Sequence, residues 1–189
     1  MQLNIYLISH PIIKLLSENI NNNELHEIIR INNSKKIGLL LVYETMRKII
    51  NIHNMYIKTL SITKNISIID TTEKFYLITN LSKTYNMITE IQLMLPNLQI
   101  INTESKSLDK LYKIVNYSKD IEEKKIKIII MENILSESWL IKIIEYISKN
   151  TAIPMNNVNI ACITCHNYIL NNIGNQYPKL NIYTTKIIQ

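Results

Sequence analysis

The chain has 189 residues, of which 47% are hydrophobic and 19% are charged, so it is long enough for one sizeable globular domain and too apolar for a disordered chain. Its apolar runs, such as LLLV and IKIIIM, are far shorter than the roughly 18 residues that a membrane-spanning helix needs. The net charge of +6 includes only two arginines, Arg30 and Arg47, and no long basic tract, which argues against nucleic-acid binding.

The composition is biased toward Ile, Asn and Lys, whereas alanine and glycine each occur only twice. Such a bias matches AT-rich codons, as in the genome of an organelle, and it leaves tight turns to Asn and Ser. The N-terminal MQLNIYLISHP lacks both the basic start and small-residue cleavage site of a signal peptide and the Arg- and Ser-rich character of a transit peptide. We therefore expect synthesis inside an organelle.

The N-terminal part is predicted to be helical and to continue into a β-hairpin. Pro11 lies near the first turn of a first helix, and Asn21–Asn23 interrupt the apolar pattern. Ser34 is predicted to cap a longer helix with one apolar face. The predicted segments are a short helix after Ile8, helices over Glu24–Ile31 and Lys35–Ile52, and strands over Met55–Leu60 and Asn65–Ile69 around a turn at Thr63–Asn65.

From Phe75 onward, predicted strands and helices alternate. The predicted strands are Phe75–Thr79, Leu98–Ile101, Ile126–Met131, Val158–Ile163 and Leu180–Tyr183. The predicted helices are Tyr85–Leu95, Leu108–Tyr117 after a polar stretch, one that begins at Ser136 or Ser138, and Asn167–Ile173. Continuous apolar runs such as FYLIT are typical of strands covered on both faces. The pattern predicts one α/β domain over residues 1–189, with a mostly parallel central sheet, helices on both faces and an N-terminal helical segment.

The stretch Lys125–Asn150 reads as a buried strand, a tight connection and an amphipathic helix. In an α/β protein, backbone N–H groups and the helix dipole meet at such a connection and can bind a phosphate. This connection contains no glycine, and Met131 stands where an acidic residue is expected. The sequence therefore predicts a nucleotide-metabolism fold with an eroded active site.

The segment Cys162-Ile163-Thr164-Cys165-His166 fits the pattern of c-type haem attachment. Cys162 lies in a predicted buried strand, so we favour a core position for it, with Cys165 and His166 at the start of a loop. A zinc site lacks a second pair of ligands, and a disulfide framework is not expected.

The remaining ionisable residues show no ligand spacing. His10, His26 and His53 are far apart in sequence and are expected to be surface or capping residues. The acidic residues can be interpreted as paired carboxylates for acid–base chemistry or, as we favour, as a solvated face; they are Asp70, Glu73, Asp120, Glu122 and Glu123. Trp139, the only tryptophan, is expected to pack in or against the core rather than to anchor an interface.

In order and content, these segments resemble the uracil phosphoribosyltransferase family, whose members have the type I phosphoribosyltransferase fold. The segments His10–Lys14 (HPIIK) and Leu40–Thr45 (LLVYET) are similar to the family's His-Pro-Leu and Leu-Leu-x-Tyr-Glu-Ala segments. Residues Lys127–Lys149 align without gaps with its strand, phosphoribosyl-pyrophosphate loop and helix. Tyr183–Thr185 is similar to its Tyr-Thr-Ala.

The departures from the family pattern are concentrated at the substrate sites. The family's loop, Asp-Pro-Met-Leu-Ala-Thr-Gly-Gly-Ser, corresponds to Met131–Trp139, which lacks the Asp and both glycines and places Glu137 where a phosphate is expected. Its Arg-Ala-Gly pyrophosphate loop corresponds to Ser82–Thr84, and its uracil-binding hood is missing. The resemblance implies Ser136, Ser138 and Lys83 as vestigial substrate-binding residues. It implies no catalytic or metal-binding residue and no cofactor, with Mg²⁺ required only if the protein is active.

We therefore expect a uracil phosphoribosyltransferase homologue that has lost catalysis and is retained as an oligomeric or partner-binding protein. The resemblance implies self-association through the hairpin Met55–Ile69. One alternative is an active or weakly active enzyme that makes UMP from uracil and phosphoribosyl pyrophosphate in pyrimidine salvage. Another alternative is a structural subunit of a larger particle. The expected location is the plastid stroma, with the cytoplasm as the alternative.

Overall fold

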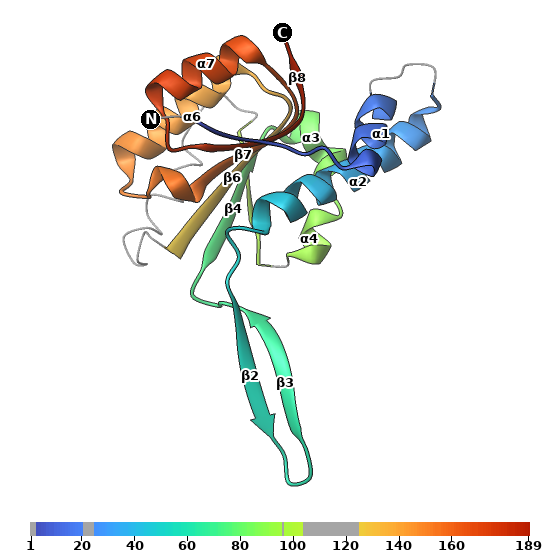
Figure 1. Cartoon of the computed structure of the whole chain (residues 1–189), viewed down its shortest axis with the longest axis vertical. Helices are drawn as coiled ribbons and strands as arrows, with labels where there is room; N and C mark the ends of the chain where they lie inside the picture. Colours follow the sequence, from blue (N-terminus) through green and yellow to red (C-terminus); the bar gives the residue numbers. More distant parts are fainter. Residues whose placement is uncertain (1–2, 21–24, 96, 104–124) are drawn as a thin grey trace.

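The computed structural model describes residues 3–20, 25–95, 97–103 and 125–189, and the statements below concern these residues. They form a six-stranded parallel sheet in the order β1-β8-β7-β6-β4-β5 and a separate antiparallel hairpin, β2–β3 (Figure 1). The strands are β1 (Asn4–Leu7), β2 (Ile52–Lys58), β3 (Thr63–Ile69), β4 (Lys74–Thr79), β5 (Gln99–Asn102), β6 (Ile126–Ile134), β7 (Val158–His166) and β8 (Asn181–Ile188). The helices are α1 (Pro11–Ile20), α2 (Glu27–Met46), α3 (Leu81–Ile88), α4 (Ile91–Met94), α6 (Glu137–Asn150) and α7 (Asn167–Gln176), with a 3-10 turn at Met155–Asn157.

The sheet carries a hydrophobic core on each face, as the alternation in the sequence predicted. Successive side chains of a strand point to opposite faces. On β4, Tyr76 and Ile78 pack in a cluster with α6 and α7, whereas Phe75 and Leu77 pack in a second cluster with α1 to α4. The predicted α/β class, with a mostly parallel sheet covered on both sides, is confirmed.

The predicted helix start at Ser34 is wrong, because α2 is one continuous helix that begins after His26. Ser34 lies inside it, and its hydroxyl donates to the carbonyl of Arg30 at 2.9 Å. A serine hydroxyl can be satisfied in this way within a helix, so its presence does not require a helix end. Burial of Ile37 and Leu41 against the sheet carries the helix past this polar stretch.

The predicted position of the hairpin turn is also wrong. The turn spans residues 59–62 and is closed by the Thr59 backbone N–H, which donates to the carbonyl of Ile62 at 2.9 Å, and by the Thr59 hydroxyl. Asn65, which the sequence placed in the turn, instead pairs with Tyr56 in the ladder. A threonine side chain thus closes a turn that often uses glycine. We call residues 52–69 the arm, since they project away from the sheet (Figure 1).

The elements of the second half were predicted in the right order but with short boundaries. The strands β6, β7 and β8 extend to Ile134, His166 and Ile188, because ladder pairing continues past the apolar residues. The helix predicted over Tyr85–Leu95 is two helices, α3 and α4. The helix predicted over Leu108–Tyr117 lies outside the described residues. None of the helices described is both long and apolar enough to cross a lipid bilayer.

Candidate functional site

A topological switch point lies between the adjacent strands β4 and β6. The chain leaves β4 toward β5, at one edge of the sheet, and leaves β6 toward β7, on the other side. In open parallel sheets, ligands bind in the crevice outside the carboxyl ends of strands at such a point. The order of the strands therefore marks the carboxyl ends of β4 and β6 as the first place to look for a site.

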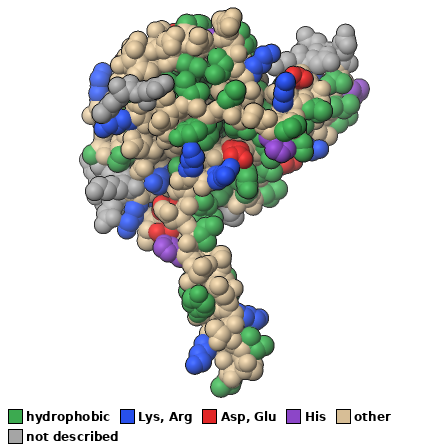
Figure 2. Space-filling model, in the orientation of Figure 1, with side chains coloured by type: hydrophobic (Ala, Val, Ile, Leu, Met, Phe, Trp, Pro, Cys, Tyr) green, Lys and Arg blue, Asp and Glu red, His purple; other side chains and the backbone are tan. Residues whose placement is uncertain are grey.

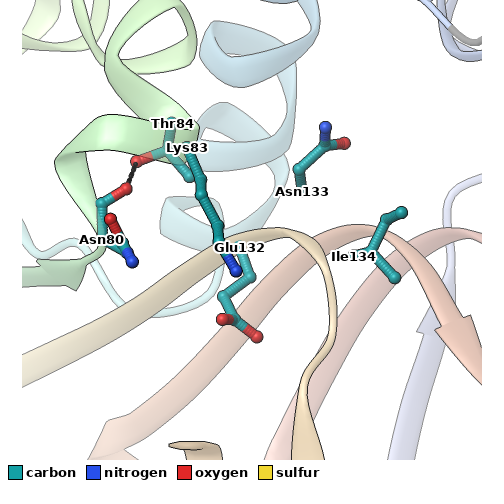
Figure 3. A pocket seen from close by; sticks show the side chains of 6 residues that line it. All are labelled: Asn80, Lys83, Thr84, Glu132, Asn133 and Ile134. Carbon is teal, nitrogen blue, oxygen red and sulfur yellow. Dashed lines mark hydrogen bonds between the residues drawn. The ribbon is translucent and has the colours of Figure 1, made fainter. Parts of the chain in front are cut away.

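A cavity of about 370 Å³ occupies this position (Figure 3). We call it the switch-point cavity; its lining residues are Asn80, Lys83, Thr84, Glu132, Asn133 and Ile134. Figure 3 shows the side chain of Lys83 extending from α3 toward the carboxylate of Glu132 on β6. The site thus combines one exposed cation and one buried carboxyl group between two short segments of chain.

Glu132 is the carboxyl group among the lining residues of the site. Its residue is only 5% exposed. Burial raises its pKa from the ordinary 4.5 to about 7, although the backbone N–H of Ser136 and the charge of Lys83 act in the opposite direction. The Ser136 N–H donates to Oε2 of Glu132 at 2.7 Å. Glu132 therefore changes its charge near neutral pH.

The connection that would hold a phosphate is shorter than the sequence predicted. Strand β6 does not end at Met131 but runs to Ile134, and only Leu135 and Ser136 separate it from α6. The Leu135 N–H donates to the carbonyl of Thr164 on β7 at 3.0 Å. No described residue has a positive φ, so this connection contains none of the left-handed turns that open a glycine-rich phosphate loop.

The junction between β4 and α3 is fixed by buried hydroxyl groups. The Thr79 and Thr84 hydroxyls are 2.7 Å apart, and the Thr79 hydroxyl donates to the carbonyl of Met131 at 2.8 Å. On the other side, Thr103 donates through its N–H and its hydroxyl to the carbonyl of Thr79 at 2.9 and 3.1 Å. These bonds tie β4 to both neighbouring strands and hold α3, and with it Lys83, against the cavity.

The three substrate-binding residues implied by the family resemblance lie near one another but have different surroundings. Lys83 lines the switch-point cavity. Ser136 is half-buried and touches the site through its N–H bond to Glu132. Ser138 is exposed and is not among the lining residues. Glu137, expected at the phosphate position, accepts a 2.8 Å hydrogen bond from Asn172 on α7.

The Cys-x-x-Cys-His segment belongs to the core. Cys162 is buried in β7 as expected, but Cys165 and His166 do not start a loop, because β7 continues through both. The thiol of Cys165 has its pKa lowered to about 7 by a hydrogen bond with Cys162, and the pKa of Cys162 is raised by the same bond and by burial. No group of three potential metal ligands exists among the described residues. Two buried thiols do not offer the access that haem attachment needs.

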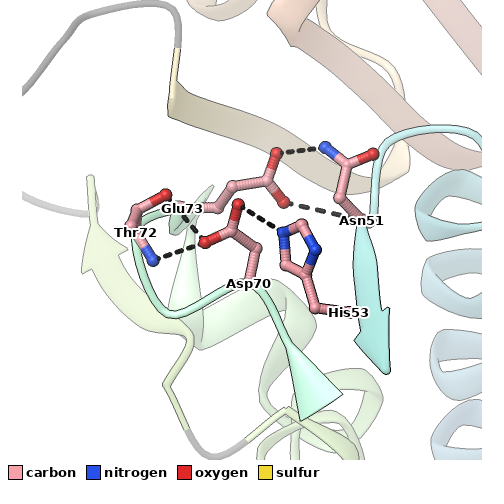
Figure 4. A network of polar contacts seen from close by, with 5 residues as sticks. All are labelled: Asn51, His53, Asp70, Thr72 and Glu73. Carbon is pink, nitrogen blue, oxygen red and sulfur yellow. Dashed lines mark hydrogen bonds and ion pairs between the residues drawn. The ribbon is translucent and has the colours of Figure 1, made fainter. Parts of the chain in front are cut away.

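The predicted acidic residues around position 70 form the base of the arm (Figure 4). His53 contacts Asp70 at 3.1 Å, and the Asn51 amide donates to Glu73 at 2.6 Å. The pKa of Asp70 is lowered to about 2, chiefly by hydrogen bonds from the hydroxyl and N–H of Thr72 and by His53. Glu73 is buried, so the solvated-face interpretation is wrong for it. Asp120, Glu122 and Glu123 lie outside the described residues.

The other single residues lie where the sequence placed them. His10 and His26 each cap a helix, since Nδ1 accepts the N–H of the residue two positions later at 3.2 and 3.4 Å. Trp139 is half-buried against the cluster of α6 and α7.

Glu132 is the site residue that sequence reasoning missed. It was aligned with a proline of the family loop and received no role. The signal was its place as the one acidic residue directly after IKIIIM, since a carboxyl group that continues a buried strand is itself buried. Asn80 was also missed; its side chain accepts a hydrogen bond from the Ser82 hydroxyl at 2.7 Å.

Comparisons with known proteins concern the chain as a whole and its fold. No family model matches the chain. A uracil phosphoribosyltransferase homolog of Porphyra purpurea is 28% identical over 190 residues, which covers 99% of this chain and 89% of the relative. A protein of the same name from Pyropia yezoensis is 26% identical over 187 residues, with the same coverage.

Among solved structures, the AQ2163 protein of Aquifex aeolicus superposes with a TM-score of 0.71 over 97% of this chain and 86% of that chain. At 15% identity, this similarity concerns the fold alone. Over nearly its whole length, the chain is therefore a divergent relative of two red algal proteins that are each named uracil phosphoribosyltransferase homolog.

Proposed function

We propose that the chain is a non-catalytic uracil phosphoribosyltransferase homologue that is retained as an oligomeric or partner-binding protein. The observation that carries this proposal is the hydrogen bond between Glu132 and the Ser136 N–H at 2.7 Å. A backbone donor at the start of α6, where an anionic substrate group would bind, already serves an internal carboxylate. Whenever Glu132 is ionised, the site thus contains its own anion.

The charge of Glu132 and the short connection between β6 and α6 also act against the binding of a phosphate. When Glu132 is ionised, it opposes a phosphate at close range; two like unit charges 4 Å apart cost about 4 kcal/mol at an effective dielectric constant of about 20. The extension of β6 to Ile134 leaves only Leu135 and Ser136 for a loop. Lys83 provides a point charge but not the bidentate geometry of an arginine. A reaction that depends on preorganised positioning loses most of its acceleration under these conditions.

The test is an assay of the purified protein for UMP formation from uracil, phosphoribosyl pyrophosphate and Mg²⁺, at pH 6 and at pH 8. The lower pH neutralises Glu132, so inactivity at both values excludes an enzyme that is only switched off by this charge. We expect no UMP above the protein-free blank, with an active uracil phosphoribosyltransferase as the positive control. UMP formation at either pH contradicts the proposal.

A series of variants distinguishes a protein that has lost catalysis from an enzyme whose activity is only weakened. Met131→Asp with Glu137→Gly restores the acid and one glycine of the family loop, and adding Glu132→Pro removes the internal anion. We expect all of these variants to remain inactive, because the pyrophosphate arginine stays absent. A gain of activity in the triple variant contradicts the proposal.

The second candidate function is a working enzyme that makes UMP, and the switch-point cavity itself favours it. A carboxyl group with a pKa of about 7 is suited to proton transfer at neutral pH. Thermal unfolding with uracil, UMP, GTP or phosphoribosyl pyrophosphate tests for binding. A ligand at about 100 times its Kd adds roughly 2.7 kcal/mol to the free energy of unfolding. Under the leading proposal, none of the four raises Tm.

The arm is the proposed surface for self-association. Both of its strands are exposed along most of their length, and hydrophobic side chains lie along it (Figure 2). Its large exposed hydrophobic side chains are Ile52, Met55, Tyr56, Ile57, Leu60, Ile62 and Ile66. A two-stranded hairpin is marginally stable in water by itself, and contact with a second chain would bury this apolar surface.

Sedimentation velocity tests the role of the arm. The variant Tyr56→Ser with Leu60→Ser removes two exposed apolar side chains from the arm, and Leu93→Ser removes one from α4 as a control. We expect the arm variant to sediment as a smaller species than the wild type and the control to sediment as the wild type. Equal sedimentation of all three proteins contradicts association through the arm.

We also propose that the protein works in a plastid. The AT-rich composition and the red algal relatives support this location. Immunogold labelling of cells that express the protein tests it, and labelling in the cytoplasm alone contradicts it.

A further inference from the structure

The edge of the sheet at β1 presents backbone hydrogen-bonding groups that no other described strand pairs with. Among the described strands, β1 pairs with β8 alone. The N–H groups of Asn4 and Ile8 donate to the carbonyls of Leu180 and Thr184 at 3.4 and 2.8 Å. Because a parallel strand directs alternate residues to the same neighbour, the N–H and C=O groups of Ile5 and Leu7 point away from β8. An unpaired edge of this kind can accept another strand.

A groove flanks β1 on each face of the sheet. On the side of α2, a groove of about 740 Å³ runs along residues 5–11 and includes Glu44, Arg47 and Lys48. On the side of α7, the described residues that line a groove of about 390 Å³ are all uncharged, and Leu3 and Leu170 are among them. A strand added to β1 would direct its side chains alternately into these two grooves.

The two grooves differ in charge, and this difference identifies the occupant. Arg47 is largely exposed and lies 3.6 Å from Glu44, so one carboxylate faces two cations in this groove. The Lys48 ammonium lies 3.8 Å above the Tyr6 ring, which stacks on Tyr183 with 4.7 Å between ring centroids. The aromatic pair fixes the cationic groove beside β1. The α2 side therefore complements acidic side chains and the α7 side complements apolar ones.

A second copy of this chain does not fit the same edge. Two β1 strands related by a two-fold axis pair antiparallel and keep corresponding faces on the same side. Arg47 and Lys48 of both copies then lie on the same side of the joined sheet, so a second copy would bring cations rather than acidic side chains to this groove.

We propose that the β1 edge binds an extended peptide segment of a partner protein, in which acidic residues alternate with apolar ones. The acidic side chains lie against Arg47 and Lys48, and the apolar ones lie against Leu3 and Leu170. The peptide backbone pairs with Ile5 and Leu7. This surface is separate from the arm and from the switch-point cavity, so the inference does not depend on self-association or on the loss of catalysis.

The experiment uses a fluorescein-labelled octapeptide of alternating Glu and Val, blocked at both ends, and measures its fluorescence anisotropy as the full-length protein is added. We expect saturable binding that weakens with added salt, since exposed charges are screened. A Lys-Val peptide of the same length is expected not to bind. Absence of binding by the Glu-Val peptide, or equal binding of both peptides, overturns the proposal.

Variants of the protein separate the backbone and charge contributions. Leu7→Pro removes an outward N–H while keeping the bonds to β8, and we expect Kd to rise about five- to tenfold, as for one lost hydrogen bond. The control Leu7→Ala removes the side chain but keeps the N–H, so it should bind nearly as the wild type does. Lys48→Glu is expected to raise Kd about tenfold or more, whereas Lys142→Glu on α6 should leave it unchanged.

A modified peptide decides the proposal even if Leu7→Pro folds poorly. A Glu-Val peptide with N-methyl groups on alternate amides keeps its charge but loses backbone donors, and we expect it to bind the wild type weakly. Undiminished binding of this peptide overturns strand addition in favour of simple anion binding. If Leu7→Pro instead converts an oligomer into a smaller sedimenting species, the edge is an interface between copies and the proposal is wrong.

Discussion

Replacing Glu132 by glutamine should change how stability depends on pH. The pKa of Glu132 is about 7 in the folded protein and 4.5 is its ordinary value, so folding favours the protonated form. The stability gained from this group is therefore fully present below about pH 4.5 and is lost as the pH rises through 7. At 1.36 kcal/mol for each pH unit between the two values, the loss amounts to about 3 kcal/mol.

Glutamine keeps the shape of the side chain and an oxygen that can accept the Ser136 N–H, but it carries no charge. We therefore expect Glu132→Gln to resemble the wild type at pH 5 and to exceed it at pH 8 by a free energy of unfolding of up to about 3 kcal/mol. Urea unfolding at pH 5, 6, 7 and 8, followed by the fluorescence of Trp139, measures this difference. The contributions of all other titrating groups to the free energy of unfolding cancel when the two proteins are compared at the same pH.

The matched control is Glu145→Gln, which changes a more exposed carboxyl group on α6 that lies 3.4 Å from Lys149. Exposed ion pairs contribute about 0–1 kcal/mol to stability, so the free energy of unfolding of this variant should stay close to that of the wild type at every pH. A difference between Glu132→Gln and the wild type that stays constant from pH 5 to pH 8 would refute the reasoning. Glu132 would then be ionised at no cost, and the internal anion would have no energetic conflict with its buried position.

Three further predictions concern the packing and the arm. A Cβ on Gly38 would clash with the backbone carbonyl oxygen of Met87, so Gly38→Ala should lower the free energy of unfolding by about 1–3 kcal/mol. In Gly174→Ala the nearest atom to the added Cβ is 3.4 Å away, so urea unfolding should show a small gain of about 0.5–1 kcal/mol. Ile143 is a fully buried residue of α6, and Ile143→Ala should lower the free energy of unfolding by about 2–5 kcal/mol in the same assay. Ile29→Ala, at an exposed position, should lower it little. Because the pKa of Asp70 is lowered to about 2, the stability it contributes is present above its ordinary pKa of 3.8 and is lost as the pH falls through 2. The stability difference between wild type and Asp70→Asn should therefore shrink from pH 5 to pH 2, and a constant difference would contradict this assignment.

The strand at Phe75–Thr79 and the position of Ser34 show which structural features the local sequence predicts and which it does not. The run at Phe75–Thr79 is apolar without interruption, because β4 is covered on both faces, and its strand was recognised with boundaries correct to one residue. Ser34 is predicted to cap a helix, because serine in general favours that position. Whether a serine caps a helix or lies within one depends on the neighbouring helices and strands, which the residue itself does not specify.

The arm and the candidate site show the same limit. The hairpin was predicted, but its register was not, since no glycine marks the turn and both faces of the arm are exposed. A register is strongly specified only where one face is buried. Likewise, Lys83 and Glu132 are 49 positions apart in the sequence, and it is the adjacency of β4 and β6 that brings them to one cavity.

The sequence by itself determined the class of fold and the order of its elements from α1 onward, because these depend on residue type and spacing. It did not predict the edge strand β1. Only the tertiary structure decided that β6 continues through Glu132, that this carboxyl group is buried, and that it binds the N–H of Ser136. Burial and pairing are set by contacts between segments distant in sequence. The charge state of a carboxyl group, and with it the chemistry of the site, follows from those contacts.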